Sequence, residues 1–267
     1  MGARERATER ADSRSRVRAV RPPAWAVAAL AVLVIAIAVL AFWRPWAQPA
    51  ASIAAGAEEV VAVTPPELLD LPENPRVLIF GDSWTWGEAA APGEGYAYVV
   101  ADIAGWTTVV DGIQGSGYLR EGKNGLTFGQ RIDRLDPAPN PELDPDLVIV
   151  QGSINDRKLY PEGYRDAVVA AWDALAELYP SARIVILGPA PHILPVEEST
   201  IAVDAELSRL AAARSWWYIS PLAEEWITDA DYLDVIDTSE VGRNHPSTAG
   251  HRYLAERLAA AVEAISR

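Results

Sequence analysis

The chain has 267 residues, of which 50% are hydrophobic and 22% charged, and its formal net charge at pH 7 is −14. This length is enough for one large globular domain or two small ones. The absence of cysteine excludes disulfides and cysteine-ligated metal sites, and three histidines leave little room for a histidine-built metal centre. The negative charge argues against nucleic acid as a partner, because phosphate binding requires a basic surface.

The charge is distributed unevenly along the chain. Residues 1–23 contain seven arginines and three acidic residues, a net charge of +4, so the remainder carries −18. Residues 24–43 contain no charge, and a helix of that length matches the hydrocarbon core of a bilayer, roughly 30 Å thick. Trp25, Trp43 and Trp46 lie at its two ends, where interfacial aromatic residues are enriched. This pattern predicts a single-pass membrane anchor with a basic cytoplasmic tail and everything after the anchor outside the cytoplasm.

The alternative to an anchor is a cleaved signal peptide, which would release the protein. Small residues at 51–57 offer a cleavage site, but the apolar run is longer than the usual signal-peptide core of about 7–15 residues, which favours the anchor. Residues 44–75 are rich in Ala, Pro and Glu with weak periodicity, which is typical of a linker. The predicted folded domain therefore spans residues 76–267.

Short apolar runs alternate with helical patterns throughout that domain. The runs are continuous rather than alternating, as expected for parallel strands covered on both faces; they lie at 77–80, 107–110, 147–151, 184–187 and 216–219. Helical patterns lie near 95–104, 161–179, 199–214 and 247–265. This order predicts an α/β fold with a doubly wound, five-stranded parallel sheet.

Ligands of such sheets bind beyond the carboxyl ends of the strands. Polar, glycine-bearing stretches follow the first three strands and open the last helix; they are residues 81–83, 111–118, 152–156 and 244–251. The topology thus predicts that segments far apart in the sequence meet at one edge of the sheet.

The residues in these stretches match the requirements of acyl transfer. That reaction needs a nucleophile, a base and donors for a developing oxyanion. Ser83 on a strand-to-helix turn offers a hydroxyl and its own N–H, and His245 is a candidate base. Asn155 offers an amide and Gly115 an unobstructed backbone N–H. Taken by itself Ser83 also fits a helix N-cap, but its companions favour the nucleophile.

With these residues the chain resembles the SGNH (GDSL-type) hydrolase superfamily, whose blocks are Gly-Asp-Ser, a glycine, Gly-x-Asn-Asp and Asp-x-x-His. The resemblance implies a role for one residue in each block: Ser83 as nucleophile, Gly115 and Asn155 in the oxyanion hole with the Ser83 N–H, and His245 as base. Gly112 and Gly117 stay open as alternatives for the second block. The family also implies a flavodoxin-like three-layer sandwich and a reaction without metal or organic cofactor.

One departure from the family pattern matters for the mechanism. The family carboxylate lies three residues before the histidine, where this chain has Gly242. Either an upstream acid reaches the imidazole from a longer loop, with Asp237 preferred over Asp234 and Glu240, or a backbone carbonyl orients it in a Ser-His dyad. Because loss of the orienting carboxylate costs about 10⁴ in rate in serine proteases, a slow or inactive family member stays an alternative.

Two further features concern the surroundings of the predicted site. Trp84 and Trp86 flank the nucleophile, either as packing residues or as a stacking wall for sugar or acyl groups. His192, after the fourth strand, is a candidate for lining the pocket.

The sequence therefore predicts a membrane-anchored serine hydrolase that acts outside the cytoplasm on ester-linked acyl groups of carbohydrates or lipids, through an acyl-enzyme. The alternatives are an O-acyltransferase acting on cell-envelope glycans and a weakly catalytic or non-catalytic glycan-binding module on the same fold. A neutral base implies activity that falls as the pH drops through the pKa of His245, expected at about 6–7.

Overall fold

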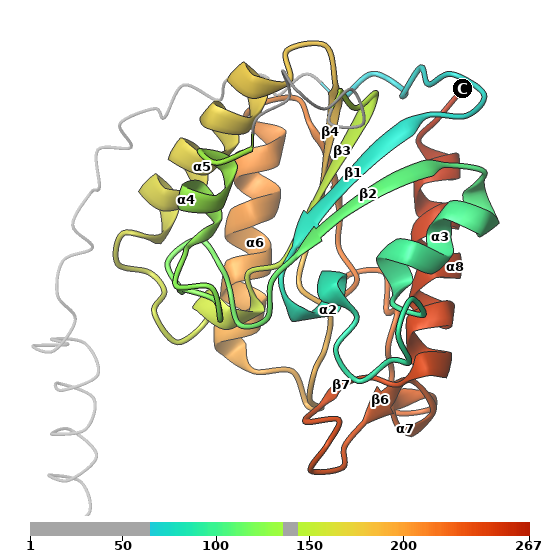
Figure 1. The fold of residues 1–267 in the computed structure, drawn as a ribbon. Coiled ribbons are helices and arrows are strands. Elements are labelled where there is room, and N and C mark those ends of the chain that lie inside the picture. The colour runs from blue at the N-terminus through green and yellow to red at the C-terminus, as the bar shows by residue number, and fades with distance from the viewer. Residues whose placement is uncertain (1–64, 136–143) are drawn as a thin grey trace, which may run out of the picture. The chain divides into compact units, whose positions relative to one another are not determined.

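The computed structural model describes residues 65–135 and 144–267 (Figure 1). The predicted basic tail 1–23, the predicted anchor 24–43 and most of the predicted linker lie outside these residues. Within the described ranges, no helix has the length and apolar character needed to cross a membrane.

A five-stranded parallel sheet forms the centre of the domain, as predicted. Its strands are β1 (Arg76–Gly81), β2 (Thr107–Gly112), β3 (Leu147–Gln151), β4 (Arg183–Leu187) and β5 (Trp217–Ile219). They lie in the order β2-β1-β3-β4-β5, and every adjacent pair is parallel. This is the flavodoxin-like order, whose ligand site lies at the switch point beyond the ends of β1 and β3.

Helices cover both faces of the sheet and complete a three-layer sandwich (Figure 1). One face carries α3 (Tyr96–Ala104) and α8 (Thr248–Ala264), and the other carries α4 (Phe128–Ile132), α5 (Tyr164–Leu178) and α6 (Glu198–Ala212). Val77 and Ile79 pack in the core on the α3 and α8 side, while Leu78 and Phe80 pack in the core on the other side. Because alternate residues of a strand face opposite layers, both sets are apolar, which explains the continuous runs in the sequence.

Several short elements at the carboxyl edge of the sheet were not predicted from the sequence. They are α2 (Ser83–Trp86), the 3₁₀ turn η2 (Ile154–Asp156), α7 (Tyr232–Val235), β6 (Ile236–Asp237) and β7 (His245–Pro246). Each is too short to show a helical or strand periodicity over a full window. Figure 1 shows α2, α7, β6 and β7 together at this end of the domain.

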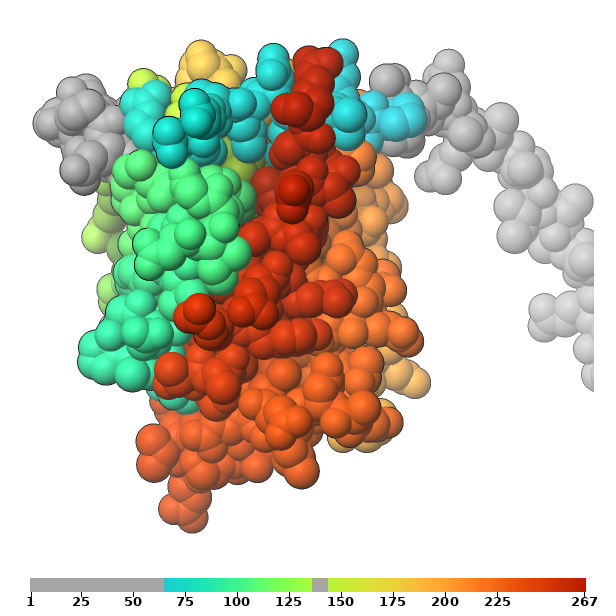
Figure 2. Space-filling model, turned by 90° about the vertical axis from the view of Figure 1, so that its right-hand side faces the viewer, coloured from blue at the N-terminus to red at the C-terminus, as the bar shows by residue number. Residues whose placement is uncertain are grey.

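The folded domain begins earlier than the predicted boundary at residue 76. Leu69 is buried and forms a parallel bridge with Ser266 after α8. Its N–H donates to Ile265 O at 2.8 Å, and its carbonyl accepts from Arg267 N at 3.0 Å. Figure 2 shows the end of α8 beside the first described residues. The assignment of residues 65–75 to the linker is thus corrected: this segment is part of the domain, because Leu69 completes the core at the base of α8.

Close packing of α8 against the segment before β6 gives a stability prediction. A Cβ at Gly250 would lie 2.0 Å from the backbone oxygen of Val235. We expect Gly250→Ala to lower the free energy of unfolding by about 1–3 kcal/mol, since overpacking forces backbone shifts. The matched control is Gly129→Ala on α4, where a Cβ meets no atom within 4 Å. Urea denaturation should show the control unchanged or stabilised by up to about 1 kcal/mol; equal stabilities for the two variants would contradict the packing argument.

Candidate active site

Ser83 is the first residue of α2, directly after β1, and it is not the N-cap of this helix. The N-cap is Asp82, whose Oδ1 accepts a hydrogen bond from Trp84 N at 2.9 Å. The Ser83 hydroxyl is therefore free for another partner, and its Oγ lies 2.9 Å from His245 Nε2. The structure thus rules out the capping role for Ser83, since Asp82 already fills it, and the role of nucleophile stays a prediction.

Three glycines lie at the end of β2 and in the loop after it, and their environments differ. A Cβ at Gly112 would lie 2.2 Å from Trp86 N, so this glycine allows α2 to pack against the end of β2. The Gly117 N–H donates to Arg120 O at 2.9 Å, so this donor already has an acceptor within the protein. The N–H of Gly115, where φ is 75°, makes no hydrogen bond with the part of the chain that the structure describes. Gly115 is thus the glycine of this loop with a donor available to a ligand.

Asn155 lies on η2, directly after β3, and its amide points to the Gly115 loop. Nδ2 donates to Ser116 O at 3.0 Å and lies 3.5 Å from Asp82 Oδ2. The second distance is at the limit of a hydrogen bond, so the N–H directed to Asp82 is the more weakly held of the two. The geometry therefore brings the amide close to both the nucleophile turn and the second-block loop.

The residue before η2 has a backbone conformation that no pattern in the sequence predicts. Ser153 has a φ of 91°, which lies in the left-handed region. It stands two residues before Asn155, at the position where the family pattern has glycine. Its hydroxyl contacts Tyr164 OH. Non-glycine residues persist in this region only where the surroundings hold them, and such positions cluster at functional sites.

Asp156, the neighbour of Asn155, fixes the shape of the second-block loop. Its buried carboxylate accepts from the backbone N–H groups of three consecutive residues, at 2.8 Å from Tyr118 and 3.0 Å from both Leu119 and Arg120. Burial raises the pKa of Asp156, and the three donors oppose that shift. The carboxylate thus holds the loop rather than facing a substrate.

His245 on β7 is oriented by a backbone carbonyl. Its Nδ1 lies 3.0 Å from Gly242 O. A carbonyl oxygen can only accept, so Nδ1 carries the proton and Nε2 presents its lone pair to the Ser83 hydroxyl. This is the tautomer that a general base needs.

The Asp237 carboxylate does not occupy the orienting position. It accepts from Ser239 N at 2.9 Å, although Asp237 and His245 are directly opposite each other in the β6–β7 pair. A Cβ at Gly242 would lie 2.2 Å from Asp237 Cγ. Glycine at position 242 therefore makes room for Asp237, and its own carbonyl takes the contact with the imidazole. The arrangement corresponds to the dyad alternative and not to the preferred Asp237 triad.

Comparison with known proteins identifies the family of this chain. Residues 79–253 match the model of the GDSL-like Lipase/Acylhydrolase family. The chain belongs to this family. It is an SGNH-type esterase, which confirms the resemblance identified from the four sequence blocks.

Several known proteins are similar to this esterase in sequence or in structure. It is 28% identical over 214 residues to GDSL lipase Rv0518 of Mycobacterium tuberculosis, which covers 73% of this chain and 84% of the relative. Est24, a carbohydrate acetylesterase from Sinorhizobium meliloti, matches with a TM-score of 0.52 and 18% identity over 70% of this chain and 98% of that one. The aryl esterase of M. smegmatis matches with a TM-score of 0.51 and 20% identity over 71% and 98%. At these identities the two structures show a shared fold.

The electrostatic environment of the esterase lowers the pKa of His245. Burial is the largest cause, and it is opposed by the hydrogen bond to Gly242 and by the negative charge of Glu88. Arg243, which forms an ion pair with Glu88, lowers the pKa further. His192 and His251 also face this region, and both have a pKa lowered to about 4, chiefly by burial, so they are neutral near pH 7.

We therefore predict an acid limb of kcat/KM below pH 6.5, the ordinary pKa of histidine. The rate should be constant near neutrality and fall as Nε2 of His245 becomes protonated at lower pH. Burial raises the pKa of Asp82 to about 7, so this carboxyl group also titrates in the range of the assay. The control variant is Asp82→Asn, which removes the titrating group and keeps a side-chain oxygen that accepts from Trp84 N. Initial rates between pH 4 and 8 on both proteins test the prediction. An acid limb at or above pH 7 in Asp82→Asn would contradict it.

Some residues around the site carried no signal in the sequence. Glu88 and Arg131 are charged yet only 8% and 4% exposed. Only their tertiary partners mark them as buried. His192, predicted to line the pocket, is held by Arg157 Nη2, 3.1 Å from its Nε2, and by Tyr232, whose hydroxyl donates to its carbonyl at 2.8 Å.

The two tryptophans beside the nucleophile have different environments. Trp84 is 5% exposed and belongs to the core on the α3 and α8 side, whereas Trp86 is 45% exposed. The packing role therefore applies to Trp84, and only Trp86 is available as a stacking surface. In the described parts of the chain, no group of three or more His, Asp or Glu side chains has metal-binding geometry.

Proposed function

We propose that this protein is a membrane-anchored serine esterase that acts outside the cytoplasm and removes ester-linked acyl groups from carbohydrates through an acyl-enzyme. The observation that carries the proposal is the 2.9 Å contact between Ser83 Oγ and His245 Nε2, with Nδ1 held by Gly242 O. This pairing activates a hydroxyl that is otherwise a weak nucleophile.

The reaction follows from the positions of these groups. Ser83 Oγ attacks the ester carbonyl while His245 Nε2 accepts its proton. The developing oxyanion is stabilised by the N–H groups of Ser83 and Gly115 and by the Asn155 amide. His245 then protonates the leaving alcohol, and a water molecule, activated by the same imidazole, attacks the acyl-enzyme and releases the acid.

An exposed aromatic ring beside the nucleophile supports a ring-bearing alcohol in the substrate. Trp86 lies three residues after Ser83 on α2, and residues at this spacing are neighbours on a helix surface. Flat apolar ring faces stack on exposed indoles. The names of the two structural relatives, a carbohydrate acetylesterase and an aryl esterase, are consistent with such alcohols. We infer that a sugar ring carrying an O-acyl group, short enough for the acetyl class, is the preferred substrate.

The test of the reaction is labelling by a fluorophosphonate probe together with hydrolysis of p-nitrophenyl esters of increasing acyl length. We expect labelling of the wild type, none of Ser83→Ala, and faster hydrolysis of acetate than of octanoate. Absence of labelling in folded protein would instead favour a glycan-binding module. Preference for octanoate would favour lipid esters, and acyl transfer to an added sugar in excess of hydrolysis would favour an acyltransferase.

The test of the alcohol is Trp86→Ala on acetylated cello- or xylo-oligosaccharides. We expect KM for the oligosaccharide to rise by about fivefold or more, corresponding to roughly 1 kcal/mol of lost stacking, with the rate on p-nitrophenyl acetate within about twofold of wild type. The control variant is Tyr98→Ala, because Tyr98 is an exposed aromatic residue on α3. Trp217 on β5 is not suitable, because its indole N–H donates to Glu67 O and its loss would disturb the fold. Equal KM values for Trp86→Ala and wild type would contradict the stacking role.

The proposed location rests on the arginine-rich residues 1–23 and the uncharged residues 24–43. Membrane fractionation of cells that express the full chain, followed by protease treatment of intact cells, tests it. We expect the esterase in the membrane fraction and its catalytic domain accessible to protease. Recovery of a shortened protein in the medium would favour the cleaved signal peptide.

A further inference from the structure

Arg131, on α4, is a cation buried beneath the loops of the active site. Its side chain is almost completely excluded from solvent, and the guanidinium lies 4.1 Å from the centre of the Phe80 ring. Burial lowers the pKa of Arg131 and the nearby Asp111 carboxylate raises it, and arginine remains charged in proteins. A buried charge is costly unless it is paired and hydrogen-bonded, so its partners show what the side chain holds.

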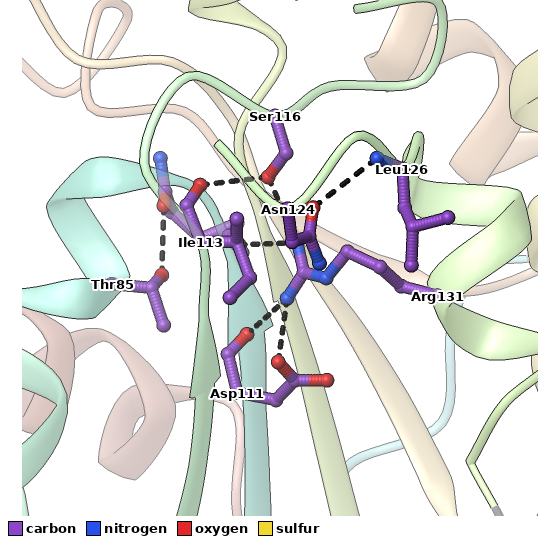
Figure 3. A network of polar contacts seen from close by, with 9 residues as sticks. Thr85, Asp111, Ile113, Ser116, Asn124, Leu126 and Arg131 are labelled. Carbon is purple, nitrogen blue, oxygen red and sulfur yellow. Dashed lines mark hydrogen bonds and ion pairs between the residues drawn. The ribbon is translucent and has the colours of Figure 1, made fainter. Parts of the chain in front are cut away.

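The first partners of Arg131 are the carboxyl ends of two adjacent strands (Figure 3). Nη1 donates to Gly81 O at 2.8 Å, at the end of β1 and two residues before Ser83. Nη2 donates to Asp111 at the end of β2, at 2.6 Å to the backbone oxygen and 2.7 Å to Oδ1. One guanidinium therefore ties the strand that carries the nucleophile to the strand that leads into the second-block loop.

The other partner belongs to that loop. Nη1 also donates to Ser116 Oγ at 2.9 Å, and this hydroxyl donates to Ile113 O at 2.8 Å (Figure 3). Ser116 is fully buried, directly follows Gly115, and accepts the Asn155 amide on its backbone oxygen at 3.0 Å. Contacts of Arg131 thus lead, within one or two residues, to each of the three oxyanion donors.

We propose that Arg131 is the positioning residue of the oxyanion hole and sets the spacing between the Ser83 N–H, the Gly115 N–H and the Asn155 amide. The proposal rests on the proposed function, since it takes Ser83 as the nucleophile. Arg131 touches neither substrate nor reacting atoms. Removing one partner of a buried ion pair lowers stability whatever its role, but a purely structural pair should leave kcat of the folded protein unchanged, whereas a displacement of about 1 Å at a catalytic group can cost about 10²-fold in rate.

The test compares Arg131→Met with a matched variant, Arg214→Met. Arg214 also pairs with an aspartate, Asp173 at 2.6 Å, and lies 5.5 Å from the centre of the Trp172 ring, but it precedes β5 at the opposite edge of the sheet. We expect Arg131→Met to lower kcat for p-nitrophenyl acetate by about 10²-fold, as removal of an oxyanion donor does, with KM within about threefold. Arg214→Met should keep wild-type kcat and KM. Thermal unfolding identifies which variants are folded at the assay temperature.

Two further variants make the test independent of whether Arg131→Met folds. Ser116→Ala removes the loop acceptor while leaving the cation in place, and we expect a loss of about tenfold in kcat at constant KM. Combining it with Asn155→Ala should cost no more than about threefold beyond Asn155→Ala alone, because both act on the same oxyanion hole and residues acting as a unit are not additive. An unchanged acid limb of the pH profile would show that His245 is unaffected.

Three results would overturn the role of Arg131: full kcat in folded Arg131→Met, a rise in KM at unchanged kcat, or multiplicative losses in the double variant. Ser83→Ala, assayed in parallel, separates this failure from that of the proposed function. If Ser83→Ala is inactive and Arg131→Met fully active, only the positioning role fails. If Ser83→Ala retains activity, the proposed nucleophile itself is wrong.

Discussion

Replacing His245 by alanine is expected to lower kcat for ester hydrolysis by about 10⁴–10⁶, the range found when a serine hydrolase loses its base. Nε2 of His245 is 2.9 Å from Ser83 Oγ, and without it the hydroxyl has no acceptor for its proton during attack. In contrast, Asp237→Ala should retain kcat within about threefold, because its carboxylate accepts from Ser239 N while Gly242 O holds Nδ1. Steady-state rates on p-nitrophenyl acetate measure both effects.

The control for this pair is Asp234→Ala, since Asp234 is another acid upstream of the histidine and lies on α7. It should behave like Asp237→Ala. A loss of 10³-fold or more in Asp237→Ala, with Asp234→Ala unaffected, would mean that the carboxylate reaches the imidazole during turnover, and the enzyme would then be a triad. Because a carbonyl gives the imidazolium less stabilisation than a carboxylate, the dyad also implies a modest kcat in the wild type.

Asn155→Ala is expected to lower kcat by about 10²–10³ with little change in KM, as removal of one oxyanion donor does. The amide donates to Ser116 O and, weakly at 3.5 Å, to Asp82 Oδ2, and we expect the weaker of these N–H groups to turn to the oxyanion, which carries its full charge only in the tetrahedral intermediate. Asn155→Asp should be at least as damaging, because a carboxylate places an acceptor where a donor is needed.

The matched control is Asn124→Ala. Asn124 lies on the neighbouring loop, and its side-chain oxygen accepts from Leu126 N at 3.2 Å (Figure 3). Its kcat should equal that of the wild type. If Asn155→Ala raised KM by the same factor by which it lowered kcat/KM, leaving kcat unchanged, the amide would bind the ground state and not the transition state.

Pattern and spacing in the sequence were sufficient for the framework of the domain. Continuous apolar runs predicted all five parallel strands, because side chains on both faces of a covered sheet are buried. The alternation of strands and helices predicted the edge at which Ser83, Asn155 and His245 meet, since the carboxyl ends of parallel strands share one edge. Short elements such as α2 and the β6–β7 pair were missed because they have too few residues to show a period.

The Gly-Asp-Ser turn shows where local sequence stops being informative. Either Asp82 or Ser83 is a suitable N-cap by residue type, and only the tertiary structure shows that Asp82 accepts from Trp84 N and leaves the Ser83 hydroxyl for another partner. The same holds for the two glycines of the loop after β2: within the described residues the Gly117 N–H has an acceptor in Arg120 O, whereas the Gly115 N–H has none.

By itself, the sequence determined the fold class, the family and the identity of the nucleophile, amide and base candidates, because these depend on residue type and order along the chain. Only the tertiary structure decided that Gly242 O and not Asp237 contacts the imidazole, that residues 65–75 belong to the domain, and that Arg131 lies beneath the oxyanion loop. The reason is physical: hydrogen-bond partners are chosen over distances of about 3 Å between segments that the chain separates by tens of residues. The periodicity of the sequence does not predict which of several carbonyl or carboxylate groups contacts the imidazole or the guanidinium.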